Sequence, residues 1–279
     1  MISAEQSPNK FTSILKSIFV KPFKSKRKNQ KNSQLSSQKQ PQQQSQLSTQ
    51  KQSQQQIQVQ NHNQTQNISQ FKSNKQSKSD SSFELVYFPI TARAQTTRTM
   101  LSLADANWKN RVPQWPQEKE SMPFGRLPQL NESRPDGSKF SLVESAAIER
   151  YLAREYGFLP SDIQTAAKLE AYVLQISDSY DAFIHHAVKT RTAESHDAMV
   201  EQFKFLFSRH EPILASNPSG HYHGDSISYP DIVLYTLYNQ AKDANSADLF
   251  NNNECPNIMK LVTRMDANSK IAAAIAAVA

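Results

Sequence analysis

The chain has 279 residues, 37% of them hydrophobic, which is enough for one large or two small domains with apolar cores. Its single cysteine, Cys255, excludes an internal disulfide, and no stretch approaches the roughly 18 consecutive apolar residues of a membrane-spanning helix. The net charge of +7 is unevenly spread: residues 1–80 carry 13 Lys and Arg against 2 Asp and Glu, whereas the remainder carries 19 against 23. The basic character therefore belongs to the N-terminal part and does not indicate a nucleic-acid surface on the rest of the chain.

Residues 1–81 are predicted to form a disordered basic tail rich in Gln, Ser and Lys. Its scattered apolar residues cannot bury enough surface to offset the entropy of ordering. Apolar residues at helical spacing nevertheless predict a short amphipathic helix over 11–20, followed by a Lys/Arg cluster. Mitochondrial targeting, contact with an anionic membrane and nuclear import all fit this pattern, and a solvated tail with one transient helix fits equally well.

An α/β arrangement begins at Phe83. Residues 83–88, FELVYF, predict a short strand. The apolar and small residues that follow fall on one face of a helix: Ala94, Thr97, Leu101 and Ala104. A strand followed directly by a helix is typical of an α/β domain.

A loop rich in Pro and Trp is expected next, and then a β-hairpin. The hairpin strands are predicted over 127–130 and 139–142, joined by the Pro-Asp-Gly turn at 135–137. A second helix is predicted over 148–156 from its apolar spacing.

After Pro160 the apolar spacing is helical throughout, with long stripes over 166–187 and 200–214. Residues 228–231, Ser-Tyr-Pro-Asp, predict a capping box at the start of another helix. The expected fold class is therefore an α/β domain over 82–158 followed by an all-α domain over 159–279.

Three motifs carry a resemblance to a known family. They are Y-F-x(4)-R-A from Tyr87, W-P-x(2)-K-x(3)-P-F-G-x-L-P-x-L over 115–130, and E-S-x-A-I-x-R-Y-L over 144–152. In this order they resemble the cytosolic glutathione transferases of the tyrosine type, the sigma class and its relatives, over about residues 83–279. The resemblance implies a thioredoxin-like domain that holds glutathione, an all-helical second domain, a homodimer, and a cytoplasmic role in detoxification.

The resemblance assigns Tyr87 as the catalytic residue, whose hydroxyl donates to the glutathione sulfur. Lowering a thiol pKa by about two units requires roughly 2.7 kcal/mol of preference for the thiolate, about what one strong hydrogen bond to a charged group supplies. Near Tyr87 the chain departs from the R-G-R-A-E that relatives often have, because it reads Thr-Ala-Arg-Ala-Gln over 91–95. Arg93 is kept and is expected to belong to the glutathione site.

The same resemblance assigns the remaining contacts to glutathione. Leu127-Pro128 matches the family's cis-proline dipeptide, whose free backbone groups pair with the cysteine portion of the peptide. Glu144 and Ser145, at a helix start, match the residues that hold the γ-glutamyl ammonium and carboxylate. Trp115 and Lys119 match the residues that contact the glycine carboxylate.

A partner subunit is expected to complete the site. The family places an acidic residue of the partner near the γ-glutamyl ammonium, and Asp181 is the candidate, with Asp178 as the alternative. Phe124 occupies the position that in some classes plugs the partner subunit. No metal is expected. The candidates for the lining of the acceptor pocket are Tyr180, Phe183 and Ile184.

Two functions remain open from the sequence. The first is an enzyme in which glutathione, held as a thiolate by Tyr87, attacks a small hydrophobic electrophile or reduces a peroxide. The second is a non-catalytic glutathione-transferase-like binding or scaffold protein that the basic tail delivers to a membrane, a nucleus or a partner.

Overall fold

The computed structural model describes residues 80–244 and 246–278. The tail expected over 1–81, with its helix over 11–20, therefore lies outside the described residues except for its last two. Within the described part, each helix is too short or too polar to span a bilayer.

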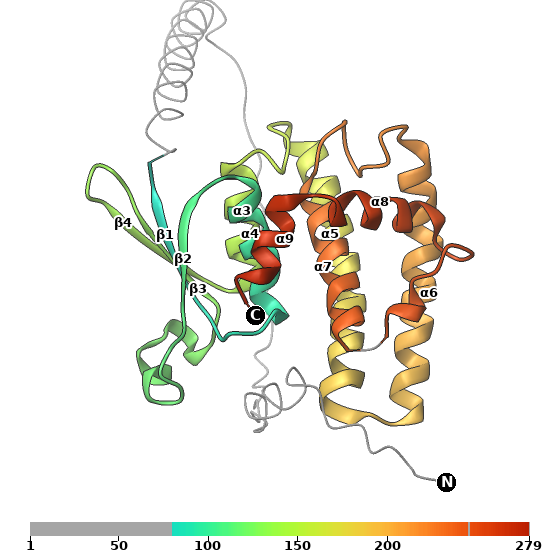
Figure 1. The fold of residues 1–279 in the computed structure, drawn as a ribbon, viewed down its shortest axis with the longest axis horizontal. Helices are drawn as coiled ribbons and strands as arrows, with labels where there is room; N and C mark the ends of the chain where they lie inside the picture. The colour runs from blue at the N-terminus through green and yellow to red at the C-terminus, as the bar shows by residue number, and fades with distance from the viewer. Residues whose placement is uncertain (1–79, 245, 279) are drawn as a thin grey trace, which may run out of the picture. The chain divides into compact units, whose positions relative to one another are not determined.

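Four strands form one mixed sheet in the order β2-β1-β3-β4 (Figure 1). β1 pairs in parallel with β2 across a connection that contains helix α3, and it pairs antiparallel with β3, which forms a hairpin with β4. The bounds are β1 Ser82–Val86, α3 Gln95–Leu103, β2 Asn107–Arg111, β3 Gln129–Ser133 and β4 Lys139–Val143. The expected strand at Phe83, the helix after it and the hairpin are confirmed.

β2 corrects the sequence analysis, which expected only a loop between α3 and the hairpin. Its five residues, NWKNR, carry one aromatic and no aliphatic side chain. Lys109 and Arg111 point to the outer face of the sheet, where Glu84 of β1 pairs with both. A strand held this way by cross-strand charges does not show the alternation of apolar residues on which the prediction relied.

Helices α3 and α4 pack together beside the sheet, and α4 also contacts β3 and β4 (Figure 1). α4 covers Ser145–Glu155. The remaining helices form the second part of the chain, with the bounds α5 Ile163–Ile184, α6 Ala193–Ser216, α7 Tyr229–Asp243, α8 Pro256–Asp266 and α9 Ser269–Ala276. Short helical turns complete the description: η1 Ala92–Ala94, η2 Gln117–Ser121, η3 Pro123–Gly125, η4 His185–Thr190 and η5 Ala247–Leu249. The expected fold class is confirmed.

One apolar core joins the two parts, since Leu85 of β1, Ile148 of α4, Ile176 of α5 and Ile232 of α7 are all fully buried in the same cluster. The expected capping box opens α7, where the Asp231 carboxylate accepts from the Ser228 N–H at 2.7 Å. The boundary expected between residues 158 and 159 stays a prediction.

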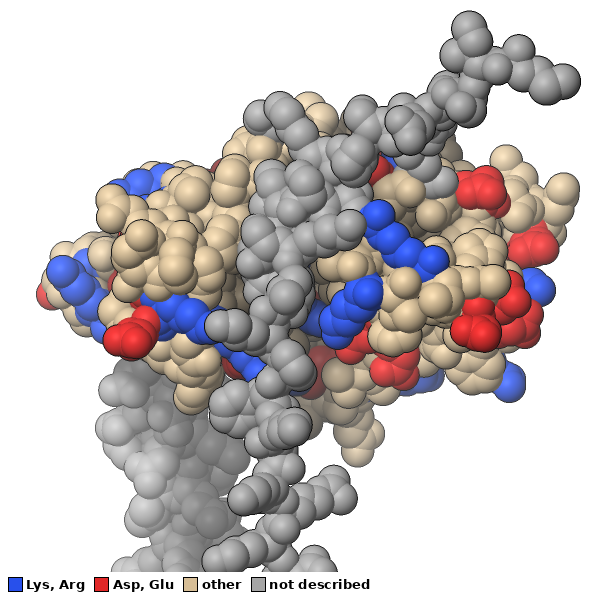
Figure 2. All heavy atoms as spheres, turned by 90° about the horizontal axis from the view of Figure 1, so that it is seen from below, with Lys and Arg blue, Asp and Glu red and all other residues tan. Residues whose placement is uncertain are grey.

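Charge is unevenly spread over the face shown in Figure 2. Acidic side chains gather over the side of the helical bundle, whereas basic side chains lie nearer the sheet and the middle of this face. The distribution agrees with the excess of Asp and Glu after residue 80.

Candidate functional site

The predicted site residues converge at one end of the sheet. Val86 lies opposite Gln129, and Gln129 lies opposite Val143. Continuing each antiparallel register by one residue places Tyr87 beside Pro128 and Pro128 beside Glu144. Three residues far apart in sequence therefore meet where their strands end, and the Leu127-Pro128 peptide bond is cis, as expected.

Tyr87 follows β1 directly and is 4% exposed. Its N–H donates to the Arg111 carbonyl at 3.0 Å, which extends the pairing with β2. Burial raises the pKa of the Tyr87 hydroxyl above its ordinary value, while a hydrogen bond from the Arg93 N–H and the charges of Arg98 and Arg93 act against the rise. The hydroxyl therefore stays protonated at neutral pH and is able to donate a hydrogen bond.

Arg93 lies in η1, close to Tyr87, and contacts helix α5. Its guanidinium donates to the Asp181 carboxylate at 2.8 Å and lies 5.2 Å from the centre of the Tyr180 ring. Asp181, the expected partner-subunit residue, is thus paired within its own chain, although its side chain remains 66% exposed. Burial, with the nearby Tyr87 adding to it, raises the pKa of Tyr180 far above its ordinary value.

The start of α4 has a strained residue and no side-chain cap. Glu144, the residue before the helix, has a φ of 72°, and no side chain caps the first turn. A non-glycine residue in this conformation costs about 1–3 kcal/mol and is found preferentially at ligand-binding sites. The first N–H groups of a helix attract negative charge, so Ser145 has the surroundings that a carboxylate requires.

A cavity of about 170 Å³ lies between α3, α4, α5 and α7. Arg93 and Ser145 line it, together with Tyr180 and the buried Glu149. Of the three candidates for the acceptor pocket, only Tyr180 reaches this cavity, because Phe183 and Ile184 are buried in the core.

The loop that bears Trp115 and Lys119 lies beside the same end of the sheet. The Trp115 ring packs edge-on against Phe88 at 5.6 Å between centres, and Phe88 packs against Tyr87 in the same way. Lys119, in η2, is exposed. The Trp115-Pro116 peptide bond is also cis, which the sequence analysis did not anticipate.

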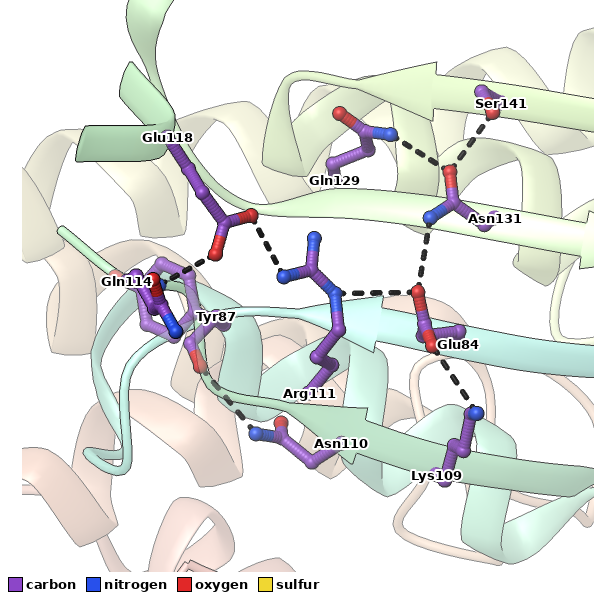
Figure 3. Close-up of polar contacts among 10 residues, drawn as sticks. All are labelled: Glu84, Tyr87, Lys109, Asn110, Arg111, Gln114, Glu118, Gln129, Asn131 and Ser141. Atoms are coloured by element: carbon purple, nitrogen blue, oxygen red, sulfur yellow. Dashed lines mark hydrogen bonds and ion pairs between the residues drawn. The ribbon is translucent and has the colours of Figure 1, made fainter. Parts of the chain in front are cut away.

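Figure 3 shows how this loop is tied to the sheet. Arg111 of β2 donates to the Glu118 carboxylate at 2.7 Å, and Glu118 in turn accepts from the Gln114 N–H at 2.6 Å. The contacts continue through Glu84 to Asn131 of β3. Hydrogen bonds with Gln114 and Arg111 lower the pKa of Glu118, which keeps the pair charged.

Three residues of the site region were missed from sequence, and all are polar groups inside the protein. Arg98 of α3 is 1% exposed, Glu149 of α4 is 9% exposed, and Asn110 of β2 bonds to the Tyr87 carbonyl at 3.4 Å. A signal existed for Arg98, which lies four residues after Ala94 and three before Leu101, inside the apolar stripe. A charge within such a stripe indicates a buried ion with a specific task.

Comparison with known proteins identifies relatives of this chain. The family model for the C-terminal domain of glutathione S-transferases matches residues 177–277. Probable glutathione S-transferase 6 of Caenorhabditis elegans is 33% identical over 166 residues, which cover 54% of this chain and 76% of that protein. Glutathione S-transferase P of Capra hircus is 27% identical over 208 residues, covering 70% of this chain and 92% of that protein.

Among solved structures, a sigma-class glutathione transferase of Fasciola hepatica has a TM-score of 0.60 at 24% identity, over 71% of this chain and 97% of its own. At 24% sequence identity, this structural similarity shows a shared fold and nothing beyond it. The sheet, the helical bundle and the site at the sheet end define a thioredoxin-like domain joined to an all-α domain. With the identity to the Caenorhabditis elegans protein added, the chain belongs to the glutathione S-transferase family.

Proposed function

We propose that this protein is a glutathione transferase of the tyrosine type, in which Tyr87 stabilises the thiolate of bound glutathione for attack on a small hydrophobic electrophile or a peroxide. One observation carries the proposal: a buried, protonated tyrosine lies at the sheet end beside Pro128 and near the uncapped start of α4. The positive charges of Arg93 and Arg98 lie close enough to the Tyr87 hydroxyl to favour negative charge beside it, as on a bound thiolate.

Each of the other site residues is assigned to one part of the glutathione tripeptide. Ser145 and the first N–H groups of α4 suit the γ-glutamyl carboxylate, and Glu144 suits its ammonium. Leu127 and Pro128 would hold the cysteine portion, while Trp115 and Lys119 would hold the glycine carboxylate. Arg93 lines the same cavity as Ser145 and would lie near the γ-glutamyl end.

We also propose a homodimer in the cytoplasm. Phe124 is 75% exposed, more than any other large apolar side chain among the described residues except Ile163. A second copy that covers Phe124 would remove this apolar surface from water. In that arrangement Asp181 faces the partner's site only if it leaves Arg93, so Asp178 remains the alternative acidic residue.

Replacing Tyr87 by Phe tests the proposal. The substitution keeps the ring volume and removes the hydroxyl, so the fold and the carboxylate contacts should survive and glutathione should still bind. The pKa of the bound thiol should rise toward the free value of about 8.5, and conjugation at neutral pH should fall about ten- to a hundredfold. Thiolate absorbance and the conjugation rate, each measured against pH, give the two readouts.

Two other results would change the assignment. Wild-type protein that binds glutathione without lowering its thiol pKa would favour the non-catalytic binding protein. A Tyr87→Phe protein that ionises bound glutathione as well as wild type does would transfer the donor role to the segment 91–93.

A further inference from the structure

Arg98 is a buried cation that no carboxylate in the described part of the chain neutralises. Its guanidinium donates to three backbone carbonyls, those of Ile90 at 2.8 Å, Phe88 at 3.0 Å and Thr91 at 3.4 Å. Two further bonds reach the side-chain oxygen of Asn110, at 3.1 and 3.0 Å. Five contacts thus engage the fork of the side chain.

Burial of a charged side chain costs free energy, so filling space in the core does not by itself explain Arg98. Burial lowers the pKa of Arg98 to about 10, so the side chain is still charged at neutral pH. A buried charge without an ionic partner is unfavourable unless hydrogen bonds satisfy it, and Leu or Met would fill the same volume without that cost. The position of Arg98 is therefore best explained by the groups that it holds.

Those groups all adjoin Tyr87. The three carbonyls belong to the loop between Tyr87 and Arg93, the residue whose charge acts on the Tyr87 hydroxyl. Within this loop Ala92 has a φ of 33°, which is strained for a residue other than glycine. A loop with a strained residue keeps one conformation only when surrounding contacts impose it.

Asn110 links Arg98 to Tyr87 itself. Its amide oxygen accepts from Arg98 while its amide nitrogen donates to the Tyr87 carbonyl at 3.4 Å, the contact drawn in Figure 3. The guanidinium carbon also lies 5.6 Å from the centre of the Tyr87 ring. A positive charge at this distance favours negative charge on or near the phenol.

We propose that Arg98, with Asn110, is the positioning residue of Tyr87: it fixes the loop between Tyr87 and Arg93 so that the phenolic proton is directed at the thiolate. The inference rests on the proposed function. It predicts that Arg98 acts on thiol ionisation through Tyr87 and contributes little to glutathione binding, because its donors are already occupied by the loop and by Asn110.

The experiment compares Arg98→Lys with wild type, because lysine keeps the charge and loses the fork. Arg209→Met, at an exposed position of α6, controls for loss of an arginine. We expect Arg98→Lys to raise the pKa of bound glutathione by about one unit, a tenfold loss of thiolate below that pKa, with the dissociation constant for glutathione within about threefold of wild type. Asn110→Ala should shift the pKa in the same direction by less.

A double mutant separates positioning from a general structural role. In the Tyr87→Phe background, Arg98→Lys should add almost no further pKa shift, because the hydroxyl that it positions is gone. Shifts that add in full would overturn the inference, and so would an unchanged thiol pKa in both Arg98→Lys and Asn110→Ala. If the lysine variant does not fold, Asn110→Ala in the two backgrounds provides the same comparison.

The proposed function fails by a different result. A Tyr87→Phe protein with an unshifted thiol pKa overturns the role of Tyr87, and with it the role of Arg98. A shift in Tyr87→Phe without one in Arg98→Lys and Asn110→Ala overturns the role of Arg98 alone.

Discussion

The two faces of the sheet use arginine in opposite ways. On the helical side Arg98 is buried, bonds to neutral oxygens, and has its pKa lowered to about 10 by loss of solvent. On the outer side Arg111 has a 36% exposed side chain, pairs with Glu118 and Glu84, and has its pKa raised, chiefly by the hydrogen bond with Glu118. The first arginine holds the loop after Tyr87, and the second holds the loop that bears Trp115 and Lys119.

The difference shows which loop of the site is held by buried hydrogen bonds and which by solvent-exposed ion pairs. A buried hydrogen bond is lost only with a large penalty, because the group left behind has no water to replace its partner. An exposed ion pair is weak and screened by salt. The loop after Tyr87 is therefore expected to be rigid and insensitive to salt, and the Trp115 loop to be adjustable.

The largest effect is expected from Glu149, another buried charge on the helical side. Its carboxylate accepts from the Tyr229 hydroxyl at 2.8 Å, and burial raises its pKa to about 7. Because this pKa lies above the unfolded value, the folded state binds the extra proton, and stability falls as the pH rises from about 4.5 to 7. Above pH 7 the folded protein bears the full cost of keeping the Glu149 carboxylate charged. This cost is at most on the order of 3 kcal/mol.

Glu149→Gln removes that charge and keeps an oxygen for Tyr229. We expect the free energy of unfolding in urea to rise by about 1–2 kcal/mol at pH 8, less than the penalty because the amide brings unpaired N–H groups, and to fall by about 1–2 kcal/mol at pH 4.5, where wild-type Glu149 is neutral and only the cost of those N–H groups remains. Glu254→Gln, at an exposed position, is the control. Equal stabilities of wild type and Glu149→Gln at pH 8 would show that water reaches this carboxylate.

A smaller effect is expected at Lys119, on the outer side. Lys119→Ala should raise the Michaelis constant for glutathione roughly three- to tenfold and leave turnover nearly unchanged, because a carboxylate contact holds ground and transition states alike. The difference in Michaelis constant between wild type and Lys119→Ala should shrink in high salt, whereas the thiol pKa shift of Arg98→Lys should not. Lys139→Ala serves as the matched exposed control, and an unchanged Michaelis constant in Lys119→Ala would remove this residue from the site.

The sequence predicted the elements whose side chains follow an apolar period and missed those stabilised by polar contacts. β1 alternates and was recognised, whereas β2 is held by Lys109 and Arg111 against Glu84 and was not. The stripe through α3 was recognised, but Arg98 within it was overlooked, because an apolar template ignores a charge. Whether such a charge is buried depends on neutral partners from distant segments, such as the loop after Tyr87 and Asn110 of β2, which no local pattern shows.

The dependence on contacts between distant segments also explains which features of the site were predicted. The end of the sheet, where Tyr87, Pro128 and Glu144 meet, was expected from the family resemblance, and the registers bring these residues together. The pairing of Asp181 with Arg93 was not expected, because it depends on where η1 meets the end of α5. Spacing along the chain fixes neither position.

The smallest effect is expected from Glu118, which positions the Trp115 loop through Arg111. Glu118→Gln keeps the shape of the side chain and a hydrogen-bond acceptor but removes the charge that pairs with the arginine at 2.7 Å. Because both partners are partly exposed, we expect the Michaelis constant for glutathione to rise only about two- to threefold at low salt, with turnover and melting temperature unchanged. Glu120→Gln, two residues further along η2, controls for the loss of a negative charge near Lys119. In about 0.5 M salt wild type and Glu118→Gln should become indistinguishable, because the ion pair that separates them is screened. A loss that persists in high salt, or one that Glu120→Gln reproduces, would mean that the outer loop is not held by this pair, and the contrast between the two arginines would then have to be abandoned.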